Sequence, residues 1–268
     1  MKKIVYDVIL YLVVFAAIQI IVSLAGGFIF GMAVESPLAL VVVSATSSIL
    51  TLALFLWRKW TPVGSEFIKS RPWAILTWST LAALGVVIPS VWLQEQLPEL
   101  PDTAGDILAK IISTPGGYFV IALLAPIVEE AVFRGAILRK LLSSMSNKWG
   151  AIAISSALFA LVHANPAQAP HAFLMGWLMG WLYMRTGSIV PGVVFHWANN
   201  TVAYLIAVAY PGNEVKLVDI FSGNETAVLM SVVVSLCIFL PALFQLNICT
   251  KTKRKKKPNK KQNSTKRK

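Results

Sequence analysis

Residues 125–138 read APIVEEAVFRGAIL, an apolar stretch that holds two adjacent glutamates, Glu129 and Glu130, and one arginine, Arg134. An ionised side chain near the centre of a lipid bilayer costs about 2.5–3.5 kcal/mol or more, so charged residues inside apolar segments mark functional sites. This stretch therefore predicts a membrane-embedded polar site, to which other apolar segments must contribute.

The composition places the chain in a membrane. The 268 residues are 56% hydrophobic and 13% charged, whereas soluble domains carry about 25% charged residues. A membrane-spanning helix needs roughly 20 apolar residues. Segments that approach this length lie near residues 5–31, 38–57, 73–94, 117–140, 150–165, 171–185, 188–209 and 227–249. We predict an all-α, polytopic membrane helix bundle of about eight transmembrane helices, formed by one domain over residues 1–250.

Basic residues predict how the helices are oriented. Lysines and arginines gather at alternate ends of the apolar segments, and cytoplasmic loops are the ones enriched in these residues. We therefore expect a multi-pass protein of the cell membrane with both termini in the cytoplasm and an uncleaved first helix. The small size and the lysine-rich end favour a bacterial source.

The C-terminal end is strongly basic. Residues 251–268 hold eleven of the 24 lysines and arginines and no acidic residue, which leaves 13 basic against 12 acidic residues in the rest of the chain. Basic residues beside a last helix are attracted to anionic lipids. This tail has none of the aromatic residues that stack on nucleic-acid bases. We predict a disordered, polybasic cytoplasmic tail that contacts membrane lipids and binds no nucleic acid.

The spacing in the central stretch separates the roles of its two glutamates. Glu130 and Arg134 are four residues apart and share a helix face, so they are expected to pair. Glu129 points elsewhere and has no cation on its own helix. Burial without a cation raises the pKa of a carboxylate, which suits a general base that acts near neutral pH. Pro126 cannot donate a backbone hydrogen bond and is expected to kink the helix and open polar backbone there.

Two more helices are expected to supply polar groups. Phe159 and His163 are four residues apart on one helix, and His196 and Asn200 have the same spacing on another. An isolated histidine of a membrane helix usually serves as an interhelical hydrogen-bonding group. Together with Glu129, these side chains favour a cluster that activates a nucleophile. Asn165 and His171, which flank prolines between two apolar segments, are expected to lie in a solvated loop.

These motifs resemble those of the CPBP family, the CAAX-protease and bacteriocin-processing (Abi) membrane peptidases. The resemblance covers about residues 115–205 and rests on Glu-Glu-x-x-x-Arg from Glu129, Phe-x-x-x-His from Phe159 and His-x-x-x-Asn from His196. It implies an eight-helix, glutamate-dependent intramembrane endopeptidase. The substrate would be a membrane-associated peptide or a membrane-anchored protein, and the biological role bacteriocin immunity or peptide maturation.

The resemblance also implies a role for each residue. Glu129 and His163 would activate a water molecule, and His196 and Asn200 would stabilise the oxyanion. Glu130, Arg134 and Phe159 would support the site. Relatives are often described as metalloproteases, and Glu129, His163 and His196 make a set of zinc ligands. The absence of a His-Glu-x-x-His pattern, and the amide of Asn200, favour a metal-free reaction over a zinc site.

Two other functions fit a polar membrane site. One is a non-catalytic immunity protein that binds a peptide on the same scaffold. The other is a proton-coupled transporter, in which Glu129, His163 and His196 would relay protons. The lack of internal repeats and the amide of Asn200, which cannot carry a proton, disfavour the transporter.

Overall fold

The computed structural model describes residues 2–29, 36–211 and 215–255, and every regular element in these ranges is a helix. Each predicted apolar segment coincides with one helix or one continuous helical run. These are α1 (Lys2–Ile29), α2 (Pro37–Trp57), α4 (Trp73–Glu95), the run η1, α6, η2 and α7 (Phe119–Leu124, Ala125–Glu130, Ala131–Leu138 and Arg139–Ser144), α8 (Lys148–Val162), α9 (Ala169–Thr186), α10 (Val190–Ala209) and α12 (Glu225–Lys255). Short helices α3 (Glu66–Lys69), α5 (Gly105–Ile112) and α11 (Leu217–Ile220) lie in the connections. The predicted all-α helix bundle is confirmed.

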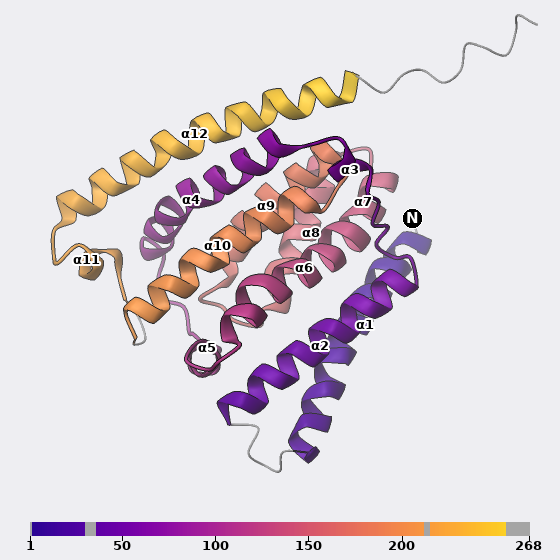
Figure 1. Cartoon of the computed structure of the whole chain (residues 1–268), viewed down its shortest axis with the longest axis horizontal. Helices are drawn as coiled ribbons and strands as arrows, with labels where there is room; N and C mark the ends of the chain where they lie inside the picture. The colour runs from indigo at the N-terminus through magenta and orange to yellow at the C-terminus, as the bar shows by residue number, and fades with distance from the viewer. Residues whose placement is uncertain (1, 30–35, 212–214, 256–268) are drawn as a thin grey trace, which may run out of the picture.

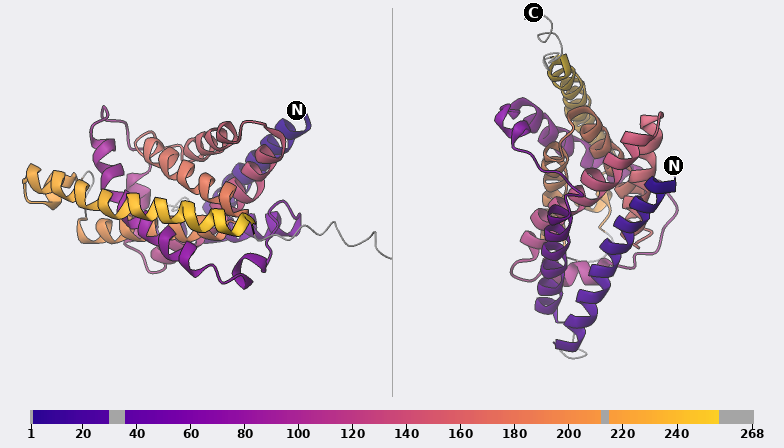
Figure 2. Two further views of the ribbon diagram at one scale, coloured as in Figure 1. Left: turned by 90° about the horizontal axis from the view of Figure 1, so that it is seen from above. Right: turned by 90° about the vertical axis from the view of Figure 1, so that its right-hand side faces the viewer.

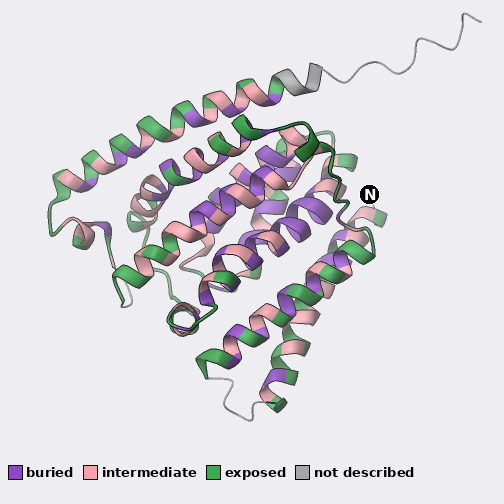
Figure 3. Cartoon of the chain, viewed as in Figure 1, coloured by how far each residue is buried: buried purple, intermediate pink, exposed green. Residues whose placement is uncertain are grey.

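The helices form a bundle whose centre is more buried than its edges. Figure 1 shows α12 lying along α4 at one edge and α1 beside α2 at the other, with α6, α8, α9 and α10 between them. In Figure 3 the buried residues concentrate on these central helices, whereas α1 and α12 are largely exposed. The exposed faces are apolar and suit contact with lipid.

Five of the described helices are long and apolar enough to cross a membrane, namely α1, α2, α4, α10 and α12. The other three segments are the run from Phe119 to Ser144, the 15-residue helix α8, and α9. The run is divided into four short helical segments and holds Glu129, Glu130 and Arg134, and α8 has only 15 residues; all three segments lie in the middle of the bundle. The protein is therefore a multi-pass membrane protein whose buried charges lie on a central helical run.

The basic ends of the helices lie at one end of the bundle. Figure 1 shows the N-terminus, α3, α7 and the last turns of α12 together, with α5 and α11 at the opposite end, and Figure 2 gives the same arrangement from two other sides. Lys140 of α7 forms an ion pair with Asp7 of α1, with 2.7 Å between Nζ and Oδ2. Arg185 donates hydrogen bonds from the end of α9 to Asn247 and Thr250 of α12. The alternation of basic and basic-poor connections thus matches the two ends of the bundle.

The C-terminal tail is described only at its beginning. Helix α12 continues to Lys255, so residues 251–255 of the expected tail are helical. Residues 256–268 lie outside the described residues. The separate disordered tail therefore stays a prediction.

The central helical run departs from α-helical geometry on both sides of Pro126. Residues 119–124 and 131–138 are π-helical, so each N–H pairs with the carbonyl five residues earlier; the N–H of Ala125, for example, donates to Val120. The helix is not ended by the proline. The predicted disturbance at Pro126 instead takes the form of wide turns, which place several carbonyls within reach of neighbouring side chains.

Three side chains donate to carbonyls of η2, the second π-helical segment. Thr61 donates to Ala131, Ser155 of α8 donates to Phe133, and Arg139 donates to Gly135. All three donors lie outside η2, and all three acceptors are backbone carbonyl oxygens. Because water is scarce inside a membrane, polar backbone groups there depend on partners within the protein. The neighbours of η2 therefore stabilise its wide turns.

Replacing Thr61 by valine tests this support. Thr61→Val keeps the shape of the side chain but removes the hydrogen bond to Ala131, and an unsatisfied buried group costs about 1–3 kcal/mol. We expect a lower thermal unfolding temperature in detergent. Thr80→Val is the matched control, because Thr80 donates only to Leu76 of its own helix. Equal losses in the two variants would show that Thr61 has no special role at η2.

Candidate functional site

The predicted pair of Glu130 and Arg134 is confirmed and lies at the centre of the site. Oε1 of Glu130 and Nη1 of Arg134 are 2.7 Å apart, and the two side chains are 0% and 1% exposed. Nη2 of Arg134 also donates a hydrogen bond of 3.1 Å to the carbonyl of Gly176 on α9. Two opposite charges that are fully buried offset each other's desolvation only when they are paired this closely.

Close helix packing makes the space for this pair. A Cβ atom on Gly192 of α10 would lie 2.5 Å from Oε2 of Glu130, and one on Gly176 would lie 3.2 Å from Ser156 of α8. Gly180, one turn after Gly176, approaches Ile152 of α8 in the same way. Gly176 and Gly180, which form a Gly-x-x-x-Gly pattern, therefore allow close packing between α8 and α9.

Phe159 of α8 joins the ion pair to the histidines. The guanidinium carbon of Arg134 lies 4.4 Å from the centre of its ring, in a cation–π contact. The rings of His163 and His196 meet the same ring edge to face, with centres 4.8 and 5.8 Å away. Phe159 therefore holds three polar side chains in fixed relation to one another.

Glu129 and Glu130 flank His196, which comes from α10. Nε2 of His196 is 3.7 Å from Oε2 of Glu129, and its Nδ1 is 3.5 Å from Oε1 of Glu130. The side chain of Glu129 is 23% exposed, in contrast to that of Glu130. The two adjacent glutamates thus differ as expected: one is sealed in an ion pair, and the other is open to an incoming molecule. The proximity of His196 to both carboxylates did not follow from sequence spacing.

His163 is held by its own helix. Its Nδ1 lies 2.7 Å from the carbonyl oxygen of Phe159. Since a carbonyl only accepts, Nδ1 carries the proton, and in the neutral ring Nε2 is free to accept a hydrogen bond. Within the described residues no hydrogen bond or ion pair joins His163 directly to Glu129, so any joint action on a water molecule would use the space between them.

Asn200 is tied to the helical run that carries the glutamates. Its Nδ2 donates a hydrogen bond of 3.1 Å to the carbonyl of Ile121. In the π-helical register this carbonyl would pair with the N–H of residue 126, which proline lacks. The amide of Asn200 therefore satisfies the polar backbone that Pro126 leaves open. Its second N–H is not used by this bond.

The structure corrects the expectation for His171 and Asn165. Neither is a solvated loop residue: His171 lies in the first turn of α9, and Asn165 is buried and donates to Asp102. A small cavity of about 110 Å³ brings His171 together with Phe159, His163, His196 and Asn200 of the predicted site. Glu129 does not line this cavity but lies beside it, 3.7 Å from His196. It is lined by Phe159, His163, Gln168, His171, Ala172, Met175, Met179, Phe195, His196, Asn199, Asn200 and Ala203. The helical spacing of His171, Met175 and Met179 was the signal that this face of α9 points inward.

Within the described part of the chain, the donor groups are not arranged as a metal site. A zinc site needs three or four protein ligands arranged around one point. Among the residues that the structure describes, no group of three or more His, Cys, Asp or Glu side chains is arranged to hold a metal. This includes the alternative zinc set of Glu129, His163 and His196.

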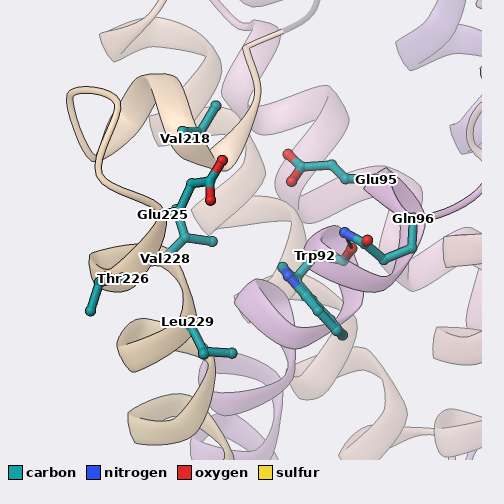
Figure 4. A pocket seen from close by; sticks show the side chains of 8 residues that line it. All are labelled: Trp92, Glu95, Gln96, Val218, Glu225, Thr226, Val228 and Leu229. Carbon is teal, nitrogen blue, oxygen red and sulfur yellow. Dashed lines mark hydrogen bonds between the residues drawn. The ribbon is translucent and has the colours of Figure 1, made fainter.

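A larger hollow of about 500 Å³ lies away from the three motifs, between the end of α4 and the start of α12. Figure 4 shows Glu95 and Glu225 facing it from the two helices, with Trp92 below them. Oε1 of Glu95 already accepts a hydrogen bond of 2.7 Å from the N–H of Leu217. This hollow contains none of the predicted site residues, and the candidate active site is the smaller cavity.

Comparisons with known proteins single out the same part of the chain. Residues 112–202 match the family described as type II CAAX prenyl endopeptidase Rce1-like. The chain is 28% identical to UPF0177 protein YxdF of Lactococcus lactis subsp. lactis (strain IL1403) over 104 residues, which cover 38% of this chain and 52% of that protein. The match thus spans about half the length of this curated relative. No solved structure matches the chain significantly. The matched residues 112–202 contain every residue of the three motifs and all the cavity-lining residues except Ala203.

Removing Arg134 tests whether the buried pair is structural. Arg134→Ala leaves Glu130 as an unpaired buried charge, and breaking a buried pair costs roughly 3–5 kcal/mol. We expect a large fall in the unfolding temperature in detergent. The double variant Glu130→Gln with Arg134→Gln removes both charges and should recover much of the loss. A double variant that melts no higher than Arg134→Ala would show that the pair does not stabilise the fold.

Proposed function

We propose that this chain, whose residues 112–202 match the Rce1-like family of type II CAAX prenyl endopeptidases, is a membrane peptidase of the CPBP type that uses Glu129 as its general base. One observation carries the proposal. A partly exposed carboxylate stands beside a sealed ion pair and within 3.7 Å of an imidazole, on a bundle whose cavity holds further imidazole and amide groups. A base within reach of water and preorganised donors are the two requirements of peptide hydrolysis.

Each residue has a role in this proposal. Glu129 accepts a proton from a water molecule, and Nε2 of His163 accepts the hydrogen bond of its other proton. The oxygen of this water then bonds to the carbonyl carbon of the substrate. His196 and the unused N–H of Asn200 face the negative charge that develops on the carbonyl oxygen. Collapse of this intermediate breaks the C–N bond, and the proton held by Glu129 passes to the leaving amine.

Glu130, Arg134 and Phe159 keep these groups in place. The ion pair fixes the helical run on which Glu129 lies, and Phe159 contacts both imidazole rings. Accurate placement matters because an oxyanion donor contributes only when it already points at the position of the developing charge. We assign these three residues a supporting role.

The substrate we propose is a peptide held at the membrane. The matched family is described as acting on prenylated CAAX ends, and a C-a-a-X end carries its lipid on the cysteine. A lipid-anchored peptide would reach the site from the bilayer that surrounds α1 and α12. Cleavage of such a peptide could provide bacteriocin immunity or complete the maturation of a peptide.

Glu129→Gln should abolish cleavage while leaving the fold intact. The amide keeps the size of the side chain but cannot accept the proton, and losing a general base costs about 10²–10⁴-fold in rate. Mass spectrometry of the products from a membrane-peptide library, incubated with protein in lipid nanodiscs, measures this. Glu99→Gln is the matched control, because Glu99 is a 91% exposed acid of a loop that pairs only with the exposed Lys216.

The same experiment separates a peptidase from a non-catalytic peptide-binding protein. A binding protein would retain peptides in the wild type without forming products. Wild-type activity that persists in Glu129→Gln would reject Glu129 as the base.

Chelation and Asn200→Asp together test the metal-free reaction. Because the described donors do not fit a metal ion, we expect activity to survive exhaustive chelation. Asn200→Asp sets a negative charge against the developing oxyanion, so its rate should fall by about 10²-fold or more. Asn147→Asp is the control, because Asn147 accepts from Gly150 as the N-cap of α8 and aspartate caps equally well. Activity that chelation removes and zinc restores, with Asn200→Asp still active, would favour a zinc site instead.

A further inference from the structure

All three histidines of the chain line the cavity of the candidate site. Two of them, His163 and His196, belong to the motifs and have roles in the proposed reaction. The third, His171, comes from the first turn of α9 and has none. The same holds for Asn199 of α10, which also lines the cavity and is 7% exposed.

A chain of hydrogen bonds connects these two residues to the predicted site. Nδ2 of Asn200 donates to the carbonyl of Ile121, as described above. Oδ1 of Asn200 lies 3.3 Å from Nδ2 of Asn199, which donates to it. The same Nδ2 lies 3.4 Å from Nε2 of His171. The chain thus runs from the helical run of Glu129 through α10 to α9.

The order of donors in this chain decides where His171 carries its proton. The carbonyl of Ile121 can only accept, so the amide nitrogen of Asn200 faces Ile121 and its oxygen faces Asn199. Turning the amide of Asn199 around would set two amide oxygens about 3.3 Å apart. Its nitrogen therefore faces both Asn200 and His171. Since Nε2 of His171 then accepts a hydrogen bond, the proton of the neutral ring is on Nδ1.

This tautomer leaves the Nδ1–H donor of His171, a residue that lines the cavity, without a hydrogen-bond partner among the described residues. Within the described residues, the His171 side chain has one hydrogen bond, the one that Nε2 accepts from Nδ2 of Asn199. The Nδ1–H group is therefore free to bind a molecule in the cavity. A peptide offers one acceptor at every residue, its backbone carbonyl oxygen.

We propose that His171 binds the substrate by donating from Nδ1–H to a backbone carbonyl near the bond that is cut, and that Asn199 is the positioning residue that sets its tautomer. This assignment rests on the proposed peptidase function. It adds a substrate-binding residue that lies outside the three motifs. Because this hydrogen bond is made equally before and during the reaction, it contributes to affinity and not to the chemical step.

Binding and cleavage of one probe test the assignment. The probe is a farnesylated peptide with a C-a-a-X end, and its dissociation constant is measured on Glu129→Gln protein in nanodiscs, where it is not consumed. Adding His171→Phe, which keeps a ring but has no donor, should raise this constant about 3- to 10-fold, as expected for one neutral hydrogen bond. In protein with Glu129 intact, His171→Phe should raise KM by the same factor and change kcat less than about 2-fold.

Asn199→Ala and a control variant complete the experiment. Asn199→Ala should raise the dissociation constant no further when His171→Phe is already present, because the two residues act through one hydrogen bond. Gln168→Ala is the control, since Gln168 lines the same cavity outside the chain of hydrogen bonds. Unfolding temperatures are compared throughout, and His171→Leu, a smaller side chain that also lacks a donor, replaces His171→Phe if the latter does not fold.

The outcomes for the two proposals are distinguishable. A wild-type protein that binds the probe without cutting it would reject the peptidase function, and the dissociation constants would still test His171. Unchanged dissociation constants in the His171 variants, a fall in kcat with KM unchanged, or a Glu129→Gln protein that does not bind the probe would each overturn the assignment of His171.

Discussion

The ion pair between Glu130 and Arg134 is the constraint on which the rest of the site depends. Both side chains are fully buried in an apolar bundle, where an unpaired charge would be strongly destabilising. Their partners must therefore be supplied by neighbouring helices at fixed positions: the carbonyl of Gly176 on α9 and the ring of Phe159 on α8. A glycine, Gly192, gives α10 room to approach the carboxylate. Each helix that satisfies the pair also brings a polar side chain to the cavity.

Much of this arrangement could be predicted from the sequence, because it depends on local spacing. The lengths of the apolar segments predicted the helices, and the interval of four residues predicted the contact between Glu130 and Arg134. Contacts between helices could not be obtained in this way. His196 lies between the two glutamates although it is far from them in sequence, and no spacing rule gives the distance between two helices. The location of His171 was missed because the prolines beside it are typical of a loop, whereas Pro170 lies in the first turn of α9, where proline is well tolerated.

The π-helical turns could not be predicted from the sequence either, although Pro126, which removes a backbone donor, could be recognised there. Pro126 indicates that some carbonyl loses its partner, and in an α-helix this would be the carbonyl of Ala122, four residues earlier. The π-helical register moves it to Ile121, and Asn200 donates to that oxygen. A wide turn is stable only where neighbouring side chains satisfy its carbonyls, and those neighbours come from other helices. The register of the backbone was thus decided by tertiary contacts.

The two adjacent glutamates show how one short motif can serve both stability and chemistry. Neighbouring residues on a helix point in different directions, so Glu130 can be sealed against Arg134 while Glu129 stays partly exposed. Sealing the first charge holds the helix that carries the second, and the wide turns after Glu130 depend on donors from α8 and the α2–α4 connection. A mobile carboxylate would spend only part of its time near His196 and near a water molecule. The buried pair, which takes no part in the proposed proton transfer, is what makes the position of Glu129 definite.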